Sequence, residues 1–270
     1  MGVQLSIAGC APVPCGDLKT VSTRSPWIST RGGVPPMSFL DALMAGWAPD
    51  GGMFLPTQIP KVSLGLLSSW RGLSYPEVCV KVLSLFIGEE DIPASDLRAI
   101  LARAFANFGH EDVVTMKPLP SQGPFQGAMA SLQVLELWHG PTLAFKDLGM
   151  CVLVETLNYL LERQGRRLTL LVGTSGDTGA SAMEAVRQST HIDCVVLYPL
   201  GRVSSVQEGQ MIRAAREIPH AYLVGVEGTS DDLDVPCEAI QQDRQFKGRH
   251  CVGTVNSVNV MRMLVQVREK

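Results

Sequence analysis

Residues 135–147 read LELWHGPTLAFKD, and Lys146 stands where an apolar, strand-like run gives way to a helix. The amino end of a helix carries a partial positive charge and favours Asp or Glu, so a lysine there is electrostatically unfavourable unless it has a task. One such task is that of an amine nucleophile. Lys146 is therefore the first candidate functional residue, and the segments around it indicate the fold.

From residue 134 onward, apolar strand-like runs alternate with helical patterns. Alternation of this kind is typical of an α/β protein with a parallel sheet and crossover helices on its faces. We expect strands at 134–137, 167–172, 192–198, 221–226 and 251–255, and helices at 145–163, 178–188, 205–216, 232–242 and 257–268.

On the amino side, the pattern predicts a helical section. Ser38 is placed to cap a helix over 39–47, Pro76 opens a second helix, and Ser95 is placed to cap a third that Gly109 closes. We divide the chain into a leader at 1–26, a helical section at 27–120, a loop insertion at 121–131 and an α/β part at 132–270.

The leader allows three interpretations. Its start, MGVQLS, fits a myristoylation pattern at Gly2, with Cys10 and Cys15 available for a second lipid. A secretory signal is less well supported, because no positive region precedes the short apolar run. An untargeted tail is the simplest interpretation, and it favours a cytoplasmic location over a lipid-anchored or secreted one.

Composition narrows the classes of function. The 270 residues carry a formal net charge of −3, and no run of Lys or Arg exceeds two, so we expect no nucleic-acid partner. The seven cysteines lack metal-binding spacing and are expected to be reduced. No apolar stretch reaches the roughly 18 residues that a membrane-spanning helix needs, so we expect no transmembrane segment.

The segment GTSGDTGAS at 173–181 follows an apolar strand. Its glycines allow the backbone to approach a ligand, and free N–H groups at the next helix start can receive a phosphate or carboxylate. An equally weighted alternative is a tight turn in which Asp177 caps the helix. We expect Gly176→Val to block anion binding, with little effect on folding provided that Gly176 does not need a positive φ.

Six motifs together resemble one family. They are WISTRGG at 27–33, APDGGMFLP at 48–56, LELWHGPTLAFKDL at 135–148, VGTSGDTGAS at 172–181, GVEGTSDDLD at 225–234 and NSVN at 256–259. The chain from Trp27 onward resembles the threonine synthase family of fold type II pyridoxal-phosphate enzymes, and within it most closely the animal threonine synthase-like 2 group. The resemblance implies a tryptophan synthase β-like sheet preceded by the family's helical amino-terminal section.

The resemblance also implies roles for individual residues. Lys146 matches the lysine that bonds covalently to pyridoxal 5'-phosphate. The remaining matches fall into a loop facing the cofactor and the substrate carboxylate (Thr174, Ser175, Gly176, Asp177 and Thr178), and a segment lining the pocket (Asn256 and Ser257).

Several of these residues have alternative interpretations. Asn256 and Ser257 could instead cap a helix. Arg31 and Arg202 are candidates for holding a substrate phosphate, although surface arginines are more common. His139 could relay protons, although a lone histidine is more often structural.

By family chemistry the substrate would be O-phosphohomoserine, a small phosphorylated amino acid. Family members release its phosphate and then form either threonine or a 2-oxo acid and ammonia, and the resemblance favours the second, phospholyase type. Lys146 would be the proton shuttle.

In the family, a glycine-rich phosphate cradle and a partner for the pyridine nitrogen lie further along the chain than Lys270 does here. We therefore expect a carboxyl-terminally truncated member with an incomplete sheet, weak cofactor binding, and an uncovered sheet edge open to self-association or a protein partner. Two hypotheses remain: a shortened lyase, or a non-catalytic product with an interaction or secreted signalling role.

Overall fold

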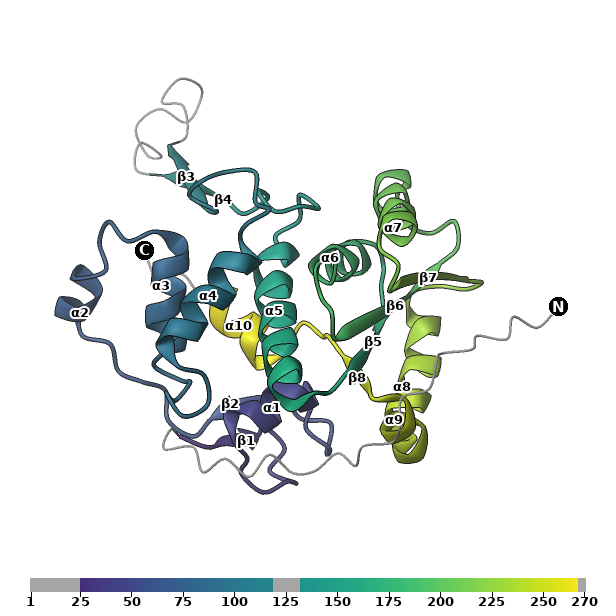
Figure 1. Cartoon of the computed structure of the whole chain (residues 1–270), viewed down its shortest axis with the longest axis horizontal. Helices are drawn as coiled ribbons and strands as arrows, with labels where there is room; N and C mark the ends of the chain where they lie inside the picture. Colours follow the sequence, from purple (N-terminus) through teal and green to yellow (C-terminus); the bar gives the residue numbers. More distant parts are fainter. Residues whose placement is uncertain (1–24, 119–131, 267–270) are drawn as a thin grey trace.

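The computed structural model describes residues 25–118 and 132–266. Its centre is a four-stranded parallel sheet in the order β7-β6-β5-β8, formed by Ala221–Val226, Ile192–Pro199, Leu168–Gly173 and Val252–Thr254 (Figure 1). The expected α/β class with a parallel sheet is confirmed. The leader up to residue 24 and the insertion at 121–131 lie outside the described residues.

Helices cover both faces of this sheet. The helices α6 (Asp177–Ala185) and α7 (Ser205–Glu217) follow β5 and β6 and pack on one face, while α8 (Asp234–Gln242) contacts β5 from the other (Figure 1). Helices on both faces agree with the strand order, because the chain first proceeds from β5 to β7 and then returns across the sheet to β8.

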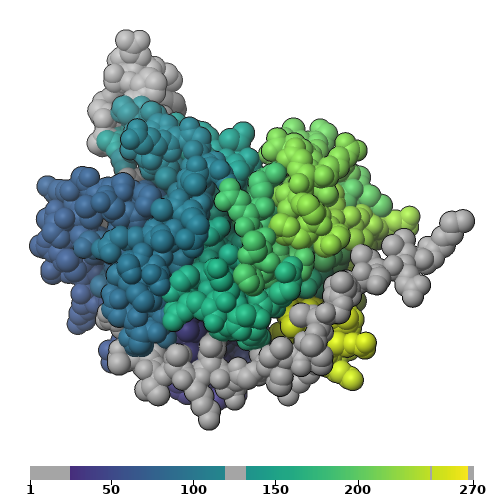
Figure 2. Space-filling view, viewed as in Figure 1, coloured from purple at the N-terminus to yellow at the C-terminus, as the bar shows by residue number. Residues whose placement is uncertain are grey.

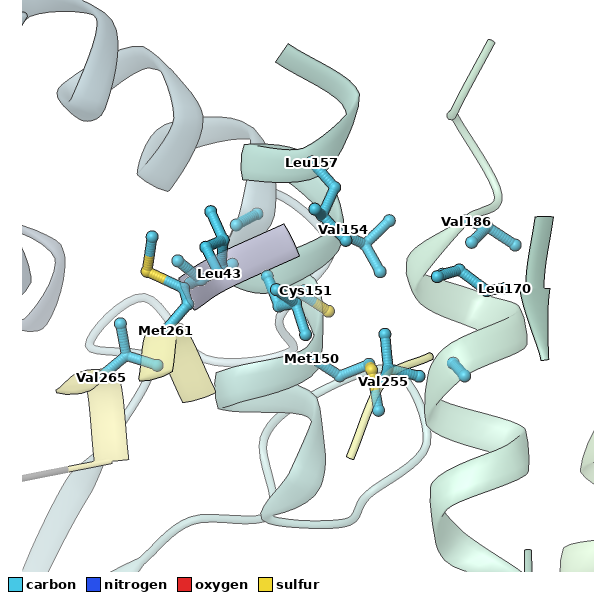
Figure 3. Close-up of a cluster of buried hydrophobic side chains, with 14 of the residues drawn as sticks. Leu43, Met150, Cys151, Val154, Leu157, Leu170, Val186, Val255, Met261 and Val265 are labelled. Carbon is cyan, nitrogen blue, oxygen red and sulfur yellow. The ribbon is translucent and has the colours of Figure 1, made fainter. Parts of the chain in front are cut away.

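The longest helix, α5 (Lys146–Gln164), lies at the centre of the molecule. In Figure 3, Leu43 and Met261 lie on one side of α5, and Leu170 and Val186 lie on the other. Helix α5 is therefore apolar nearly all round and joins the amino-terminal helices to the parallel sheet, which is the pattern of a buried helix. Figure 2 shows the two parts packed side by side.

The amino-terminal section contains two small antiparallel sheets and four helices among the described residues. The bounds are β1 Trp27–Ser29, α1 Phe39–Ala45, β2 Phe54–Pro56, α2 Leu64–Ser68, α3 Tyr75–Leu83, α4 Ala94–Ala104, β3 Thr115–Pro118 and β4 Gln133–Glu136. The chain then continues through the parallel sheet, in which the remaining elements are η1 Asp231–Leu233, α9 Arg244–His250 and α10 Val260–Gln266.

Of the three expected helix starts, at Ser38, Pro76 and Ser95, the first two are found. The Ser38 hydroxyl accepts the Asp41 N–H at 3.1 Å, and Ser74 and Glu77 form a capping box at the start of α3, with Pro76 inside the first turn. The expected Ser95 cap is wrong, because α4 already begins at Ala94, after Pro93. The proline ring fixes φ near the helical value, here −55°, so Pro93 takes the cap position two residues before the expected cap.

The strand expected at 134–137 is present as β4 but does not belong to the parallel sheet. It pairs antiparallel with β3, from Thr115 opposite Glu136 to Pro118 opposite Gln133. An antiparallel partner close in sequence satisfies its backbone hydrogen bonds locally. The expectation that Lys146 follows a strand of the main sheet is therefore wrong.

Other boundaries shift by a few residues, and five elements were not expected: β1, β2, α2, β3 and α9. The helices α2 and α9 are only 5 and 7 residues long, too short to show a clear period, and α9 interrupts the segment between α8 and β8. Within the described residues, β7 and β8 form the two edges of the parallel sheet. Self-association through such an edge stays a prediction.

The described cysteines carry free thiols: Cys79, Cys151 and Cys194 are buried, and Cys237 and Cys251 are partly exposed. This agrees with the expectation of reduced cysteines for these five. Within the described ranges, no helix combines the length and apolar character that crossing a bilayer requires.

Candidate active site

The register of the parallel sheet brings two expected loops to one edge. Leu171 of β5 lies beside Thr254 of the parallel strand β8, so the segments that follow these strands leave the sheet at the same, carboxyl edge. They are 174–178 and 255–259. The carboxyl edge of such a sheet is the usual location of ligands in open α/β folds.

The Lys146 amine meets one of these loops. Lys146 is the first residue of α5, and its Nζ lies 3.2 Å from Oδ2 of Asp177, the first residue of α6. The Lys146 side chain is 23% exposed, and its Nζ lies 4.8 Å from the centre of the Phe145 ring. An accessible amine is thus held between an aromatic face and a carboxylate.

Asp177 has a second partner, Gln207 of α7, which the sequence analysis did not identify. The Gln207 amide donates to Oδ1 of Asp177, while Lys146 binds Oδ2. The Gln207 hydrogen bond, followed by the hydrogen bond and charge of Lys146, holds the pKa of the Asp177 carboxyl below its usual value. Asp177 is therefore an ionised counter-ion for the Lys146 amine.

The backbone of the 174–178 loop is shaped by the buried Thr174. Its hydroxyl accepts the N–H groups of Gly176 and Gly179, both at 2.9 Å, so this side chain organises the loop rather than projecting from it. Ser175 is exposed at the tip, and Thr178 is half-buried. The Asp177 cap is wrong: Gly176 holds the cap position, and the Asp177 side chain turns to Lys146 and Gln207.

Gly176 has a φ of 140°, which side-chain-bearing residues rarely adopt, and a Cβ atom there would collide with the side chain of Gln207. The condition for a harmless Gly176→Val substitution is therefore not met. Glycine is needed here because the backbone passes close to Gln207.

On the other side of Lys146, Asp147 is a buried carboxylate that the sequence analysis also missed. It accepts the N–H of Thr142 at 2.8 Å and the Thr142 hydroxyl at 2.7 Å. Burial raises the pKa of the Asp147 carboxyl, and the hydrogen bonds from Thr142 oppose this effect. A Cβ atom on Gly140 would collide with Asp147, so the sequence GPT allows the 140–142 turn to pack against the start of α5.

The turn before α5 is also strained. Leu143 has a φ of 61° although it is not glycine, and its side chain is 70% exposed. Strain of this kind in a non-glycine residue is more frequent near functional sites than elsewhere.

The segment after β8 contributes Asn256 and Ser257. The Asn256 Oδ1 accepts the Val258 N–H at 3.0 Å, whereas its buried Nδ2 has no hydrogen-bond partner among the described residues. The helix-cap interpretation of this pair is wrong, because Asn259 performs that role through the Met261 N–H at 3.0 Å. Ser257 is exposed.

Three expected site residues lie apart from the Lys146–Asp177 contact. The Nε2 of His139 lies 3.1 Å from the Thr115 hydroxyl and 3.4 Å from the Glu136 carboxylate, at the base of the β3–β4 pair. Arg31 donates to the Asp50 carbonyl at 3.2 Å between β1 and β2. Arg202 is exposed, and its charge contributes to lowering the pKa of Asp232.

Known proteins share this sequence and arrangement. Residues 26–105 match the family model described as Threonine synthase N terminus. Over 241 residues the chain is 43% identical to threonine synthase-like 2 of Xenopus laevis and 41% identical to that of Homo sapiens, covering 89% of this chain and 49% and 48% of those proteins. Over nearly all of its own length, the chain is therefore similar to proteins of the threonine synthase family.

Solved threonine synthases have the same fold. The PLP-bound threonine synthase from Brucella melitensis matches with a TM-score of 0.79 and 37% identity, over 90% of this chain and 50% of that one. The yeast threonine synthase matches with a TM-score of 0.81 and 32% identity, over 91% of this chain and 48% of that one. The chain spans about half the length of the threonine synthases and threonine synthase-like proteins that it matches.

Proposed function

We propose that this chain belongs to the threonine synthase family, binds pyridoxal 5'-phosphate (PLP) through Lys146 and acts as a phospholyase or threonine synthase-like enzyme on O-phosphohomoserine. The observation that carries the proposal is the contact between the Lys146 amine and Asp177, at the carboxyl edge of the parallel sheet. An accessible lysine amine beside an ionised carboxylate has the chemistry to bond to an aldehyde such as that of PLP.

The residues present fit this cofactor. The Nδ2 of Asn256 is a buried donor without a partner among the described residues, and it lies in the segment that leaves the same sheet edge as the 174–178 loop. A buried donor left unpaired is costly, so a ligand acceptor would stabilise it. Lys146 would hold the cofactor covalently, Asn256 and Ser257 would line its pocket, and Ser175, Gly176, Asp177 and Thr178 would face the ring and the substrate carboxylate.

When bound, PLP supplies an electron sink for carbanions at the substrate carbons. The chain's own contribution is the placement and proton chemistry of Lys146, whose Nζ holds a proton beside Asp177 and can deliver it to a substrate carbon. We propose that Arg31 and Arg202 bind the substrate phosphate and that His139 relays protons. Each would have to reach the site from the position described above.

Reduction with borohydride tests the cofactor proposal directly. Purified protein supplied with PLP and then reduced should carry the label on Lys146, and Lys146→Ala should lose it. Lys81→Ala is the matched control, because Lys81 is an exposed lysine at the end of α3. Label spread over surface lysines, and unchanged in Lys146→Ala, would overturn the proposal.

The reaction is tested separately, by adding O-phosphohomoserine to the PLP-loaded protein and measuring phosphate. Threonine as the second product would favour synthase chemistry, whereas a 2-oxo acid with ammonia would favour the phospholyase. No phosphate from a protein that carries PLP on Lys146 would overturn the substrate proposal and leave the cofactor proposal intact.

A second candidate function, interaction without catalysis, is favoured by one observation. Three apolar side chains in the segment that precedes Lys146 in sequence are exposed: Trp138 at 47%, Leu143 at 70% and Phe145 at 49%. Exposed apolar side chains close together often mark a contact surface. Sedimentation of the parent and of Trp138→Ser tests this candidate: a parent that self-associates and a variant that does not would support it, and a monomeric parent that turns over O-phosphohomoserine would exclude it.

A further inference from the structure

The amino end of α7 carries a residue whose identity is not explained by the helix alone. Ser204 and Gln207 form a capping box: the Gln207 Oε1 accepts the Ser204 N–H at 3.2 Å and the Ser204 hydroxyl at 2.9 Å. Glutamate serves this position as well as glutamine does, and its charge would suit a helix amino end better. The cap therefore gives no reason for glutamine.

The reason lies on the other side of the same amide group. The Nε2 of Gln207 donates to Oδ1 of Asp177, whose Oδ2 is bound to Lys146. A glutamate at 207 would have no proton to donate, and it would place a second carboxylate against Asp177. Only the amide can accept from Ser204 and donate to Asp177 at the same time.

The contact is held in place from both sides. Gly176 leaves no Cβ atom in the space that Gln207 occupies. One turn further along α7, the Gln210 amide donates to the Thr142 carbonyl at 3.0 Å, and Thr142 is the residue that Asp147 binds beside Lys146. Helix α7 thus contacts both loops that flank the Lys146 amine.

We propose that Gln207 is a positioning residue, which orients Asp177 so that its carboxylate holds the Lys146 amine. This deepens and rests on the proposed function, because the orientation matters only if Lys146 is the reactive amine. Among the described residues, Lys146 is the only charged side chain that contributes to the pKa shift of Asp177, so a change at Gln207 should be visible at Asp177 itself.

The test compares three variants. Gln207→Glu preserves the helix cap and removes the donor to Asp177. Ser204→Ala removes the hydroxyl of the cap and preserves that donor. Gln242→Glu introduces the same change at the exposed end of α8, without a described contact.

The readout is the pH titration of the Asp177 carboxyl carbon, followed by NMR without PLP and assigned with Asp177→Asn. We expect an upward shift of the Asp177 titration midpoint in Gln207→Glu, because a neighbouring carboxylate disfavours ionisation. Ser204→Ala should be less stable but should titrate like the parent, as should Gln242→Glu. An unshifted midpoint in Gln207→Glu, or an equal shift in Ser204→Ala, would overturn the proposal.

The yield of borohydride-trapped PLP on Lys146, at limiting PLP, should fall several-fold in Gln207→Glu and stay at the parental level in Gln242→Glu. Equal trapping in Gln207→Glu and parent would overturn the positioning role. Absence of trapping in the parent would overturn the proposed function instead, and the Asp177 titration would still report on the Gln207 contact.

Discussion

Lys146 Nζ and Asp177 Oδ2, 31 positions apart in sequence, lie 3.2 Å from each other and join the first residue of α5 to the first residue of α6. Two helix amino ends therefore meet at one ion pair. Each end favours the Asp177 carboxylate, and the carboxylate in turn offsets the unfavourable position of the Lys146 ammonium.

Asp177→Asn should change stability little at neutral pH. The Asp177 side chain is 41% exposed, and ion pairs this accessible contribute at most about 1 kcal/mol. Because the pKa of Asp177 is lowered in the folded state, its contribution is present above the ordinary value of 3.8 and is lost as the pH falls through the lower, folded value. Urea unfolding at pH 7 and pH 3 should show the difference between parent and variant shrinking at the lower pH, and a difference that grows would contradict this.

Gly176→Ala should destabilise the protein by about 2 kcal/mol or more, because alanine is strained at a φ of 140° and its Cβ would displace Gln207. Gly209→Ala is a matched control within α7, where a Cβ atom would meet nothing within 4 Å. That variant should gain about 0.5–1 kcal/mol, as expected for glycine replaced by alanine in a helix. Equal unfolding midpoints for the two variants would show that the Gly176 backbone can relax.

Asp147→Ala should cost about 3 kcal/mol, because it leaves the buried N–H and hydroxyl of Thr142 without their acceptor. Asp147→Asn should cost less, since its amide oxygen can still accept one of these hydrogen bonds. Thr142→Ser, which keeps both donors, is the control and should stay within about 1 kcal/mol of the parent.

The pH dependence of Asp147 has the opposite sign to that of Asp177. The pKa of Asp147 in the folded state is raised above its ordinary value of 3.8. Between the ordinary and the raised value the folded state binds more protons than the unfolded state, so stability falls as the pH rises. Asp147→Asn should remove this fall. Parallel stability curves for parent and Asp147→Asn across that range would contradict the assignment.

The parallel sheet and its helices were predictable because each strand and helix carries its own periodicity. The partner of a strand is not encoded in this way, and so β4 was assigned to the wrong sheet. The apolar run at 134–137 fits either environment, and β3, with the sequence TMKP, shows no alternation that would have indicated a local partner.

The residues of the candidate site that belong to a sequence motif were predictable. The contacts that depend on how the helices pack were not. Lys146 and Asp177 stood out in their own segments, but their contact depends on how α5 meets α6. The capping box of Ser204 and Gln207 could have been recognised in the sequence SSVQ, yet its second role appears only once α7 lies beside the 174–178 loop.

Arg262 of α10 is a buried cation, 2% exposed, whose Nε and Nη1 atoms have no hydrogen-bond partner among the described residues. Burial lowers the pKa of its guanidinium, and no described acidic side chain opposes this effect. A buried charge without a counter-ion costs free energy, so Arg262→Met, which keeps an unbranched chain without the charge, should raise the free energy of unfolding by about 1 kcal/mol or more.

Arg216→Met on the exposed face of α7 is the control for this change and should stay within about 0.5 kcal/mol of the parent. Both variants are compared by urea unfolding in a buffer free of phosphate and sulfate, so that no added anion can pair with the guanidinium. If Arg262→Met is instead less stable than the parent while Arg216→Met is unchanged, the Arg262 guanidinium must be paired in solution. The buried charge would then be a stabilising contact, and its acceptor would have to be sought outside the described residues.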